Sequence, residues 1–308
     1  MPVDIVSGIV CTRNRPDSLR RTVRSLLASQ NSRVELIVVD QSDGSEAEEA
    51  LAPFAADERL RYVRSHVRGK GAAMNEAARC ARGAILVFTD DDCEVQSGWM
   101  EAMAKVLREQ PRVAVLFCNV VAAECNWSEG YVPTYQRRKD RRISSLIQTC
   151  TGHGMGAGMA VRRDFVLGLG GFDEEVGPGA RFPSGDDWDI AHRALLNGWD
   201  VYETADLAVL HHGFRTHAEG RDHVYRDWLA IGAVCAKPIR AGHWTAIALP
   251  VWYFAVHALW PPVSDVFRLR RPQGLSRIRG FFDGLLQGAR TPVNRRTLLF
   301  KPLASRPA

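Results

Sequence analysis

The stretch Ala84-Ile85-Leu86-Val87-Phe88-Thr89-Asp90-Asp91-Asp92 joins an apolar run to three consecutive carboxylates. A short run of β-branched and large apolar residues after Gly83 is typical of a buried strand in a parallel sheet. Ligands bind at the C-terminal ends of such strands. Because adjacent carboxylates repel one another and oxygen ligands suit hard cations, the triplet predicts a Mg²⁺ or Mn²⁺ site. The alternative is a solvated acidic loop that caps a helix beginning near Ser97.

The chain before this stretch alternates between strand and helix patterns. Apolar runs at residues 5–10, 34–39 and 60–64 predict three further strands. An apolar stripe at helical spacing after Pro16 predicts a helix between the first two, and a small-residue segment at 72–82 predicts another before the central strand. This alternation predicts an α/β fold with a doubly wound, Rossmann-like and mostly parallel sheet.

The pattern continues more weakly beyond the acidic triplet. We expect a helix over residues 99–108 and strands over 113–117 and 207–210. A helix is also expected from His192 to Leu196. The glycine-rich stretch at 152–160 comes too late in the chain for a dinucleotide-binding turn, and we interpret it as flexible backbone near a ligand.

Charge and composition restrict the partners. The 308 residues are 46% hydrophobic with a net charge of +5, and the basic residues are nearly all arginine, which prefers phosphate and carboxylate partners. Nucleotides and anionic lipid fit this excess, whereas no basic and aromatic nucleic-acid motif is present, so nucleic acid is not expected. Seven cysteines without a C-x-x-C pair predict a reduced, cytoplasmic protein. Asp4 interrupts the first apolar run, so we expect no secretory signal.

Five short motifs follow one another in the chain. They are Val10-Cys11-Thr12-Arg13-Asn14-Arg15-Pro16, Val39-Asp40-Gln41-Ser42-Asp43-Gly44-Ser45, Phe88-Thr89-Asp90-Asp91-Asp92, Gly170-Gly171-Phe172-Asp173 and Gly185-Asp186-Asp187-Trp188-Asp189. This series resembles the family 2 glycosyltransferases, enzymes of the GT-A fold that use a nucleotide-sugar donor. The family more often has Glu-Asp where this chain has Asp186-Asp187. The resemblance extends over about residues 3–216.

The resemblance implies a GT-A catalytic domain over residues 1–216, followed by a helical, basic and apolar region over 217–308. It also implies a metal-dependent, inverting transfer of a sugar from a nucleoside-diphosphate donor to an acceptor hydroxyl. In such a transfer one carboxylate accepts a proton and a cation neutralises the leaving diphosphate. A polysaccharide, glycolipid or lipid-linked acceptor of the cell envelope is expected.

The same resemblance assigns roles to individual residues. The implied donor-binding residues are Thr12, Arg13, Asp40, Lys70, Asp90 and Asp91. The implied metal ligands are Asp92 and His211, with His212 as the neighbour of the second. The implied general base is Asp187, with Asp186 and Asp189 as rivals, and the implied acceptor-side residues are Gly171, Phe172, Asp186 and Trp188. Two alternatives stay open, a nucleotidyltransferase that releases pyrophosphate and a non-catalytic nucleotide-sugar or cation-binding module.

The C-terminal third differs in character. Residues 244–260 contain no Asp, Glu, Lys or Arg, and a tryptophan stands at each end. This run is at the short limit for a membrane span and contains Pro250, so we expect interfacial or re-entrant membrane contact before a buried core helix or a span. Arginines at 268–279 lie beside an apolar stripe and predict peripheral attachment to an anionic membrane surface, with a solvated basic face as the alternative.

Overall fold

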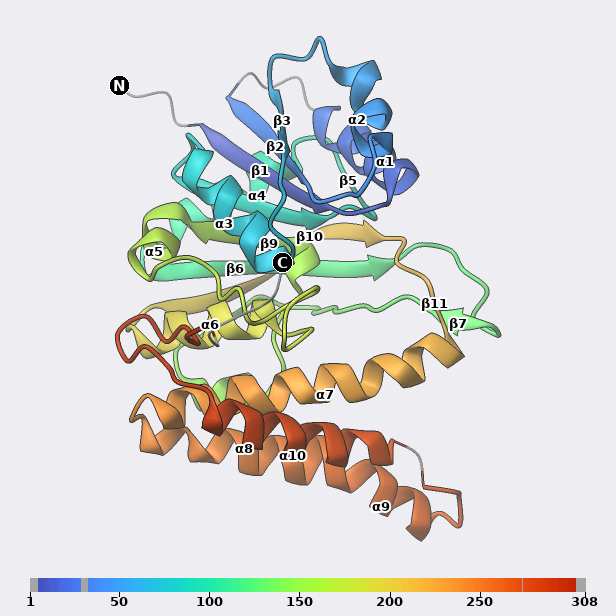
Figure 1. Cartoon of the computed structure of the whole chain (residues 1–308), viewed down its shortest axis with the longest axis vertical. Coiled ribbons are helices and arrows are strands. Elements are labelled where there is room, and N and C mark those ends of the chain that lie inside the picture. Colours follow the sequence, from blue (N-terminus) through green and yellow to red (C-terminus); the bar gives the residue numbers. More distant parts are fainter. Residues whose placement is uncertain (1–4, 29–32, 273, 303–308) are drawn as a thin grey trace.

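The computed structural model describes residues 5–28, 33–272 and 274–302. In these ranges nine strands form a main sheet, and a further layer of helices lies below it in Figure 1. The strand order is β3 (Leu60–Arg64), β2 (Val34–Asp40), β1 (Val6–Thr12), β4 (Ile85–Asp90), β9 (Met159–Arg162), β6 (Val113–Ala122), β10 (Asp200–His211) and β5 (Cys93–Val95), and β8 (Arg141–Ile143) pairs with β10. The predicted α/β fold is confirmed.

The first half of the sheet has the predicted winding. β1 pairs in parallel with β2 and with β4, and β2 pairs in parallel with β3. The connecting helices are α1 (Pro16–Leu27), α2 (Glu46–Leu51) and α3 (Lys70–Cys80). All seven residues of β2 are buried, which explains why the strand is apolar apart from Glu35 and its terminal Asp40. The parallel strands end together, so their C-terminal residues meet at one edge.

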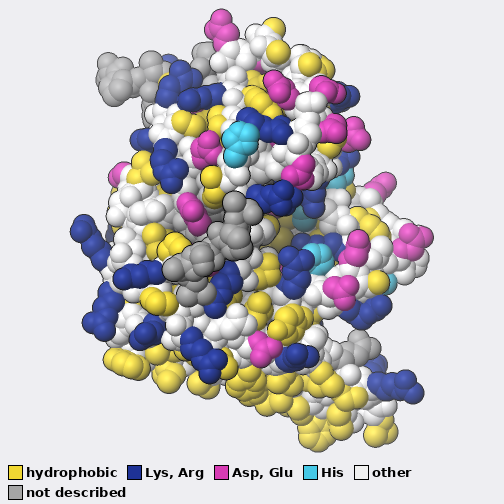
Figure 2. Space-filling view, viewed as in Figure 1, with side chains coloured by type: hydrophobic (Ala, Val, Ile, Leu, Met, Phe, Trp, Pro, Cys, Tyr) yellow, Lys and Arg dark blue, Asp and Glu magenta, His cyan; other side chains and the backbone are white. Residues whose placement is uncertain are grey.

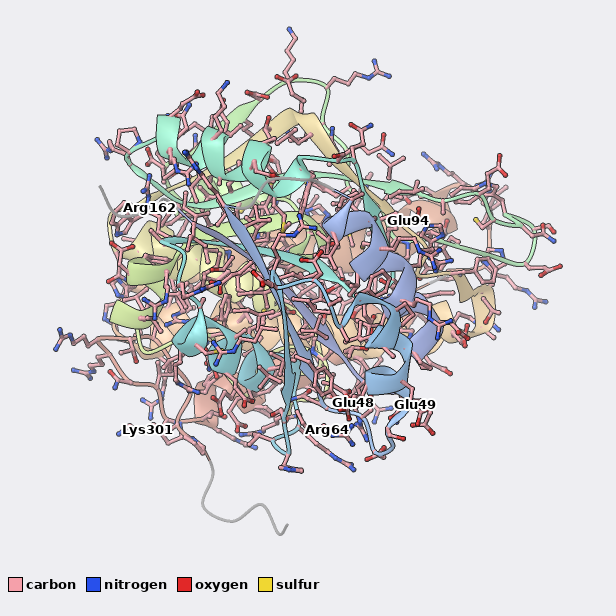
Figure 3. The ribbon with its side chains drawn as sticks, turned by 90° about the horizontal axis from the view of Figure 1, so that it is seen from above. Glu48, Glu49, Arg64, Glu94, Arg162 and Lys301 are labelled. Atoms are coloured by element: carbon pink, nitrogen blue, oxygen red, sulfur yellow. The ribbon has the colours of Figure 1, made fainter. Side chains whose placement is uncertain are left out.

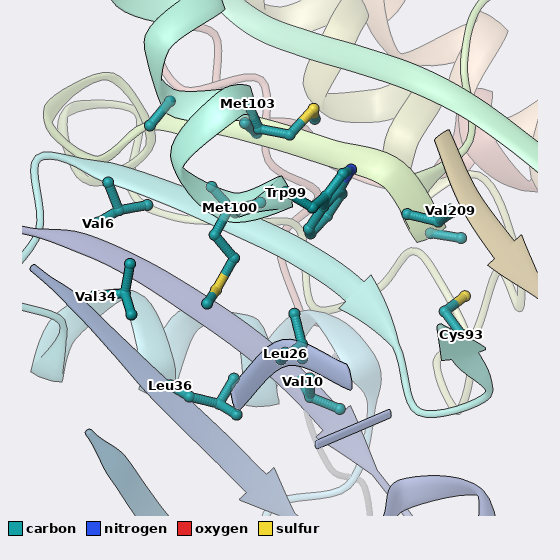
Figure 4. Close-up of a cluster of buried hydrophobic side chains, with 14 of the residues drawn as sticks. Val6, Val10, Leu26, Val34, Leu36, Cys93, Trp99, Met100, Met103 and Val209 are labelled. Carbon is teal, nitrogen blue, oxygen red and sulfur yellow. The ribbon is translucent and has the colours of Figure 1, made fainter. Parts of the chain in front are cut away.

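Helices cover both faces of the sheet. One face is covered by α1, α2 and α4 (Trp99–Glu109), and Figure 4 shows part of this cluster, where Met100 and Leu26 lie among the strand residues Val10 and Leu36. The other face is covered by α3, α5 (Arg163–Gly168) and α6 (Asp186–Leu196). Because each helix buries one apolar stripe, the sheet is enclosed between two apolar layers.

The glycine-rich stretch leads into the sheet, and its Met155 lines the cavity described below, while the expected flexibility stays a prediction. It contains a short 3₁₀ helix, η3 (Gly156–Gly158), and then β9, which pairs antiparallel with both β4 and β6. A Cβ at Gly158 would lie 2.6 Å from the Cys118 sulfur, and one at Gly154 would lie 2.2 Å from Phe117. The glycines therefore allow close packing against β6.

Several element boundaries differ from the sequence expectations, and the two largest differences concern α6 and β10. α6 begins at Asp186, not at His192, so the acidic motif forms its first turn. β10 begins at Asp200, not at Leu207, and its pairing with β6 shifts register between Glu203 and Ala208. Polar residues at this irregularity interrupt the apolar alternation that identifies a strand.

The C-terminal region is helical, as expected. α7 (His217–Arg240) and α10 (Leu275–Arg290) run side by side in Figure 1, and a Cβ at Gly284 would lie 1.9 Å from the Leu229 carbonyl oxygen. Between them, a continuous helical segment comprises η4 (Trp244–Ile247), α8 (Ala248–Trp252), η5 (Tyr253–Leu259) and α9 (Trp260–Phe267). Within the described ranges, this helix over Trp244–Phe267 is the one that is long and apolar enough to cross a membrane.

A buried ion-pair cluster joins the helical region to α6 and to the loop between α5 and α6. The Lys237 ammonium on α7 lies 2.5 Å from Asp173 and also pairs with Asp189. The backbone N–H of Phe300 donates to the same Asp173 carboxylate at 2.8 Å, and the Phe300 ring lies beneath the ammonium. The change from strands to helices falls near the expected boundary at residue 216, but the two parts share this buried contact. The division into two domains stays a prediction.

Candidate active site

A cavity of about 470 Å³ lies at the C-terminal ends of β1, β4 and β10. It is where the parallel strands of such a sheet are expected to place a ligand site. All but one of the expected donor and metal residues line it. These lining residues are Thr12, Arg13, Lys70, Asp90, Asp91, Asp92 and His211. Residues more than 190 positions apart in the chain thus meet at one edge of the sheet.

The acidic triplet takes part in a network of hydrogen bonds and ion pairs. Asp90 ends β4, and Asp91 is buried, where it accepts a hydrogen bond from the Thr12 hydroxyl at 2.7 Å. The Arg15 guanidinium donates to Asp91 at 3.1 Å and to Asp92 at 3.0 Å. Arg15 was not predicted as a site residue, although it lies in the quoted motif before Pro16. The sequence feature that could have identified Arg15 is its position after the first strand, where the chain enters α1.

The pKa values of the two neighbouring carboxyls shift in opposite directions. Burial raises the pKa of Asp91 to about 6, although the Arg15 guanidinium and the Thr12 hydroxyl oppose this shift. Burial also acts to raise the pKa of Asp92, but the His211 imidazole, Arg15 and Lys70 outweigh it and lower the pKa below its usual value. Asp92 is therefore the member of this pair that stays ionised most readily.

Asp92 and His211 have the arrangement of metal ligands. The His211 Nε2 lies 3.3 Å from Asp92 Oδ1, and among the described residues no donor forms a hydrogen bond to this buried oxygen. His211 Nδ1 lies 3.0 Å from the carbonyl oxygen of Pro133, which can only accept a hydrogen bond. Nδ1 must therefore carry a proton. Burial acts to lower the pKa of His211, but the Asp92 carboxylate outweighs it and raises that pKa, and the ring offers the lone pair of Nε2 once Nε2 has lost its proton. Both atoms are suited to a divalent cation.

The sulfur of Cys93 completes a group of three candidate ligand atoms within 4.8 Å of one another. Burial raises the pKa of the Cys93 thiol, so the sulfur keeps its proton. A protonated thiol is a poor ligand, and Mg²⁺ and Mn²⁺ prefer oxygen. The oxygen of Asp92 and the nitrogen of His211 are thus the better donors.

His212 faces away from this pair. Its Nε2 lies 2.8 Å from Glu94, a residue labelled in Figure 3. Successive side chains of a strand point to opposite faces, and His211 is the last residue of β10. The structure thus identifies His211, and not His212, as the histidine beside Asp92. The sequence alone could not separate the two.

Asp40 is the expected donor residue that is absent from the described residues lining the cavity. It is fully buried at the end of β2 and accepts hydrogen bonds from Tyr62 at 2.7 Å, from Arg64 at 2.9 Å and from the backbone N–H of Ser42 at 2.8 Å. Arg64, labelled in Figure 3, also donates to two carbonyl oxygens of the same loop. This arrangement fits Asp40 as the residue that orders the loop, and its contact with a nucleotide base stays a prediction.

Lys70 connects the two acidic groups of the site. Its ammonium donates to Asp90 at 2.7 Å and lies 3.5 Å from Asp186. Burial acts to lower the pKa of Lys70, but the carboxylates of Asp186 and Asp90 outweigh it and raise the pKa well above its usual value. Lys70 is therefore a permanent positive charge in the cavity wall.

Asp187, the expected base, lies in the first turn of α6 beside this network. Its Oδ2 accepts the backbone N–H of Gly156 at 2.9 Å, and its Oδ1 accepts that of Trp188 at 2.8 Å. Burial raises the pKa of Asp187 although both backbone N–H groups oppose the shift. Asp187 is not among the cavity-lining residues in the described ranges, and neither is Asp186. Its role as base stays a prediction.

The other expected acceptor-side residues are held by packing. Phe172 is buried with its ring 5.3 Å from that of Phe88, and a Cβ at Gly171 would clash with Asn75. Trp188 lies between His153 at 5.0 Å and Tyr253 at 4.7 Å. In the described part of the chain, none of Gly171, Phe172 and Trp188 lines the cavity. These three residues pack against neighbouring residues in the structure. Their contact with an acceptor stays a prediction.

The sequence did not predict the outer wall of the cavity. This wall includes Phe214, Arg215, Glu219 and His223. Arg215 belongs to β11 (Arg215–Thr216), which pairs with β7 (Gly130–Tyr131), and Glu219 and His223 belong to the first turns of α7. These residues follow the last of the quoted motifs, so no motif marked them. The helical region therefore contributes directly to the site.

The fold and the site define a protein of the GT-A type. The family model described as Glycosyl transferase family 2 matches residues 7–168, which is more than half of the chain. The chain belongs to this family. The match confirms the resemblance drawn from the motifs, which favours a glycosyltransferase over a nucleotidyltransferase or a non-catalytic module.

Curated relatives are distant and longer. The chain is 25% identical to the probable N-acetylgalactosaminyltransferase 9 of Caenorhabditis elegans over 221 residues, which is 63% of this chain and 37% of the relative. It is 28% identical to the O-antigen biosynthesis protein RfbC of Myxococcus xanthus over 225 residues, which is 67% of this chain and 17% of the relative. The match thus spans well under half the length of each relative.

Solved structures share the fold. A TarS structure from S. aureus covering residues 1–349 has a TM-score of 0.60 at 15% identity, over 93% of this chain and 81% of that chain. The mannosyltransferase PcManGT from Pyrobaculum calidifontis, in complex with GDP-Man and Mn²⁺, has a TM-score of 0.63 at 19% identity, over 92% and 86%. TarS has also been solved with UDP-GlcNAc. At these identities the likeness establishes the fold.

Proposed function

We propose that this glycosyltransferase moves a sugar from a nucleoside-diphosphate donor to an acceptor hydroxyl, with inversion and with the help of a divalent cation. The observation that carries the proposal is the buried, unpartnered Oδ1 of Asp92, 3.3 Å from His211 Nε2, at the end of a cavity lined by Lys70. The PcManGT complex with GDP-Man and Mn²⁺ supports a similar donor and metal here.

Asp92 and His211 would hold Mn²⁺ or Mg²⁺, which offsets the charge of the departing diphosphate when bound. The remaining donor contacts come from the chain itself. Arg13, Arg15 and Lys70 all line the cavity and supply positive charge for phosphate oxygens. Arg15 is already oriented by Asp91 and Asp92, and Lys70 by Asp90, so little side-chain entropy is lost when they meet a phosphate.

Asp187 is the residue that accepts the proton of the acceptor hydroxyl. Its raised pKa strengthens its affinity for a proton while the two backbone N–H groups hold its orientation. Burial raises the pKa of Asp186 as well, although the Lys70 ammonium opposes this shift. Asp186 is the weaker candidate because it lies 3.5 Å from that ammonium as an ion-pair partner. A single displacement assisted by one base inverts the anomeric centre, in agreement with the resemblance to inverting members of the family.

The acceptor is a glycan or a lipid-linked glycan of the cell envelope. Support comes from relatives named as the O-antigen biosynthesis protein RfbC and, at 31% identity over 99 residues, the succinoglycan biosynthesis protein ExoO of Rhizobium meliloti. The enzyme acts in the cytoplasm, where nucleotide sugars and reduced cysteines coexist.

Calorimetric binding of UDP, GDP, dTDP, CMP and ATP, with and without Mn²⁺, tests the proposal. We expect one nucleoside diphosphate to bind in a Mn²⁺-dependent manner to the wild type, and Asp92→Asn to remove that dependence. Asp17→Asn, which changes an exposed carboxylate on α1, is the matched control and leaves binding unchanged. Absence of metal-dependent binding for every nucleotide would overturn the proposed metal site.

A further inference from the structure

A continuous apolar surface covers the outer side of the C-terminal helices. Figure 2 shows it as a band of hydrophobic side chains along the lower edge of the molecule. We call it the C-terminal apolar surface, and its exposed residues are Trp244, Ile247, Val251, Trp252, Leu259, Trp260, Val266, Phe267, Leu269, Leu275, Phe282 and Leu286. The spacing of Trp244, Ile247 and Val251 places them on one side of a helix. An exposed patch of this extent marks an interaction site.

The opposite side of the same helix is attached to the catalytic part of the chain. The Tyr253 hydroxyl donates to the Thr149 carbonyl oxygen at 2.7 Å, and His257 Nε2 lies 3.2 Å from that of Cys150. Thr149 and Cys150 belong to the 3₁₀ segment η2 (Leu146–Thr151). The middle of the apolar helix is therefore fixed along the catalytic domain.

This attachment distinguishes the three interpretations of the apolar run. A core helix would be mostly buried, but only 33% of the most apolar window is buried. A spanning helix would carry its midpoint to the bilayer centre, and the polar backbone of η2 would have to enter hydrocarbon with it. A helix that lies in the plane of the membrane surface keeps η2 on the aqueous side and places Trp252 and Trp260 at the interface.

The charge around the surface favours an anionic partner. Residues 244–302 contain nine Lys or Arg residues and two Asp or Glu residues. The rest of the chain contains 31 Lys or Arg residues and 33 Asp or Glu residues. The excess positive charge of the whole protein thus belongs to the segment of the chain that contains the apolar surface. The loop after α9 combines both properties, because Leu269 is 97% exposed between Arg268 and Arg270. Arginines that flank an inserted apolar side chain are suited to lipid phosphates.

A second copy of the chain fits the same surface less well. A self-contact would bring this basic region against itself with only Asp265 and Asp283 as acidic side chains in residues 244–302. Like charges that meet across an interface are unfavourable, and an anionic bilayer offers the opposite charge.

We infer that the C-terminal apolar surface docks the enzyme in plane on an anionic lipid bilayer. The helix over Trp244–Phe267 lies at the level of the headgroups, and the arginines of the following loop contact lipid phosphates. This inference goes beyond the proposed transfer reaction and does not depend on it.

Flotation of the full chain with vesicles tests the inference. Vesicles of phosphatidylcholine alone are compared with vesicles that also contain phosphatidylglycerol. We expect the wild type to bind the anionic vesicles about tenfold or more tightly than the neutral ones, and binding to weaken as salt is raised. Failure to bind anionic vesicles would overturn the inference.

Two pairs of variants locate the contact. Trp260 and Trp127 are both 59% exposed, and only Trp260 lies on the C-terminal apolar surface, so Trp260→Ser should weaken binding about tenfold while Trp127→Ser leaves it unchanged. Arg270→Glu should weaken binding to anionic vesicles, whereas Arg24→Glu on α1 should not. Equal binding by the members of either pair would refute the assigned surface.

Light scattering and nucleotide binding complete the test. A dimer of the wild type that Trp260→Ser converts to a monomer, with no vesicle binding, would assign the surface to a second copy. Nucleotide binding should be the same in all four variants, since none of these residues lines the cavity within the described ranges. Vesicle binding without metal-dependent nucleotide binding would retain the docking inference and refute the proposed metal site instead.

Discussion

The ammonium of Lys237 lies 2.5 Å from a carboxylate oxygen of Asp173, and both side chains are 2% exposed. Asp173 belongs to the motif that resembles an acceptor-side element of the family, and Lys237 belongs to α7, outside every motif. The contact is therefore a buried ion pair that joins the part of the chain with the family motifs to the helical region. Burying both charges costs free energy of desolvation. Removing one partner costs more, because it leaves the other charge buried and uncompensated.

Lys237→Met should reduce the free energy of unfolding by about 3–5 kcal/mol, because Asp173 and Asp189 lose their shared partner while they stay buried. Urea denaturation measures the change. Lys105→Met removes an exposed lysine on α4 and should cost less than about 1 kcal/mol. Equal losses in the two variants would contradict the importance of the buried cluster.

Asp187→Asn should lower turnover about a hundredfold or more and leave nucleotide binding nearly unchanged, since asparagine keeps the shape but cannot accept a proton. Steady-state kinetics and calorimetry separate the two effects. Asp186→Asn is the comparison, and we expect it to weaken donor binding more than turnover because it removes a partner of Lys70. The reverse pattern would transfer the role of base to Asp186.

His211→Ala should lower the affinity for Mn²⁺ at least about tenfold, because it removes one of the two best-placed ligand atoms. His212→Ala is the matched control, since its ring faces Glu94 and not Asp92. Titration of Mn²⁺ by its electron paramagnetic resonance signal gives both affinities. A loss confined to His212→Ala would reverse the assignment.

Two buried histidines predict a loss of stability in acid. Burial lowers the pKa of His153 to about 4 and, together with the charges of His153 and Lys237, that of His192 to about 3. The unfolded chain takes up these protons near pH 6.5, so the stabilisation is complete above that value and is lost as the pH falls toward 4. For His153 the loss approaches about 3 kcal/mol.

Thermal unfolding at several pH values checks this slope. His153→Phe removes one of the two groups and preserves the ring that stacks on Phe117 at 5.5 Å, so it should flatten the profile between pH 6.5 and 4. His66→Phe changes an exposed histidine in the loop after β3 and should leave the slope unchanged. An unaltered slope in His153→Phe would contradict the assignment.

The strands of the first half of the sheet could be predicted because burial on both faces makes them continuous apolar runs. β2 and β4 are of this kind. β9 could not, since its four residues follow a glycine-rich segment and its partners β4 and β6 lie far away in the chain. A short antiparallel strand is fixed by tertiary pairing and not by its own pattern.

The candidate site shows a similar limit. The carboxylates of the acidic triplet were predicted because a strand that ends in charge is a local signal. Arg15 was missed because its two ion pairs cross more than 70 positions of sequence, and Glu219 because it begins a helix that no motif marks. The sequence identified Asp40 as a site residue, but it could not reveal that Tyr62 and Arg64 already occupy its carboxylate.

The course of α7 has a practical consequence. Its first turns supply Glu219 and His223 to the cavity wall, its last turns carry Lys237, and Phe300 returns to contact the same Asp173. A fragment cut near residue 216, where the motifs end, would lose a wall of its active site and leave the carboxylates of Asp173 and Asp189 without Lys237. Any expression fragment intended for crystallisation or kinetics should therefore extend through Phe300.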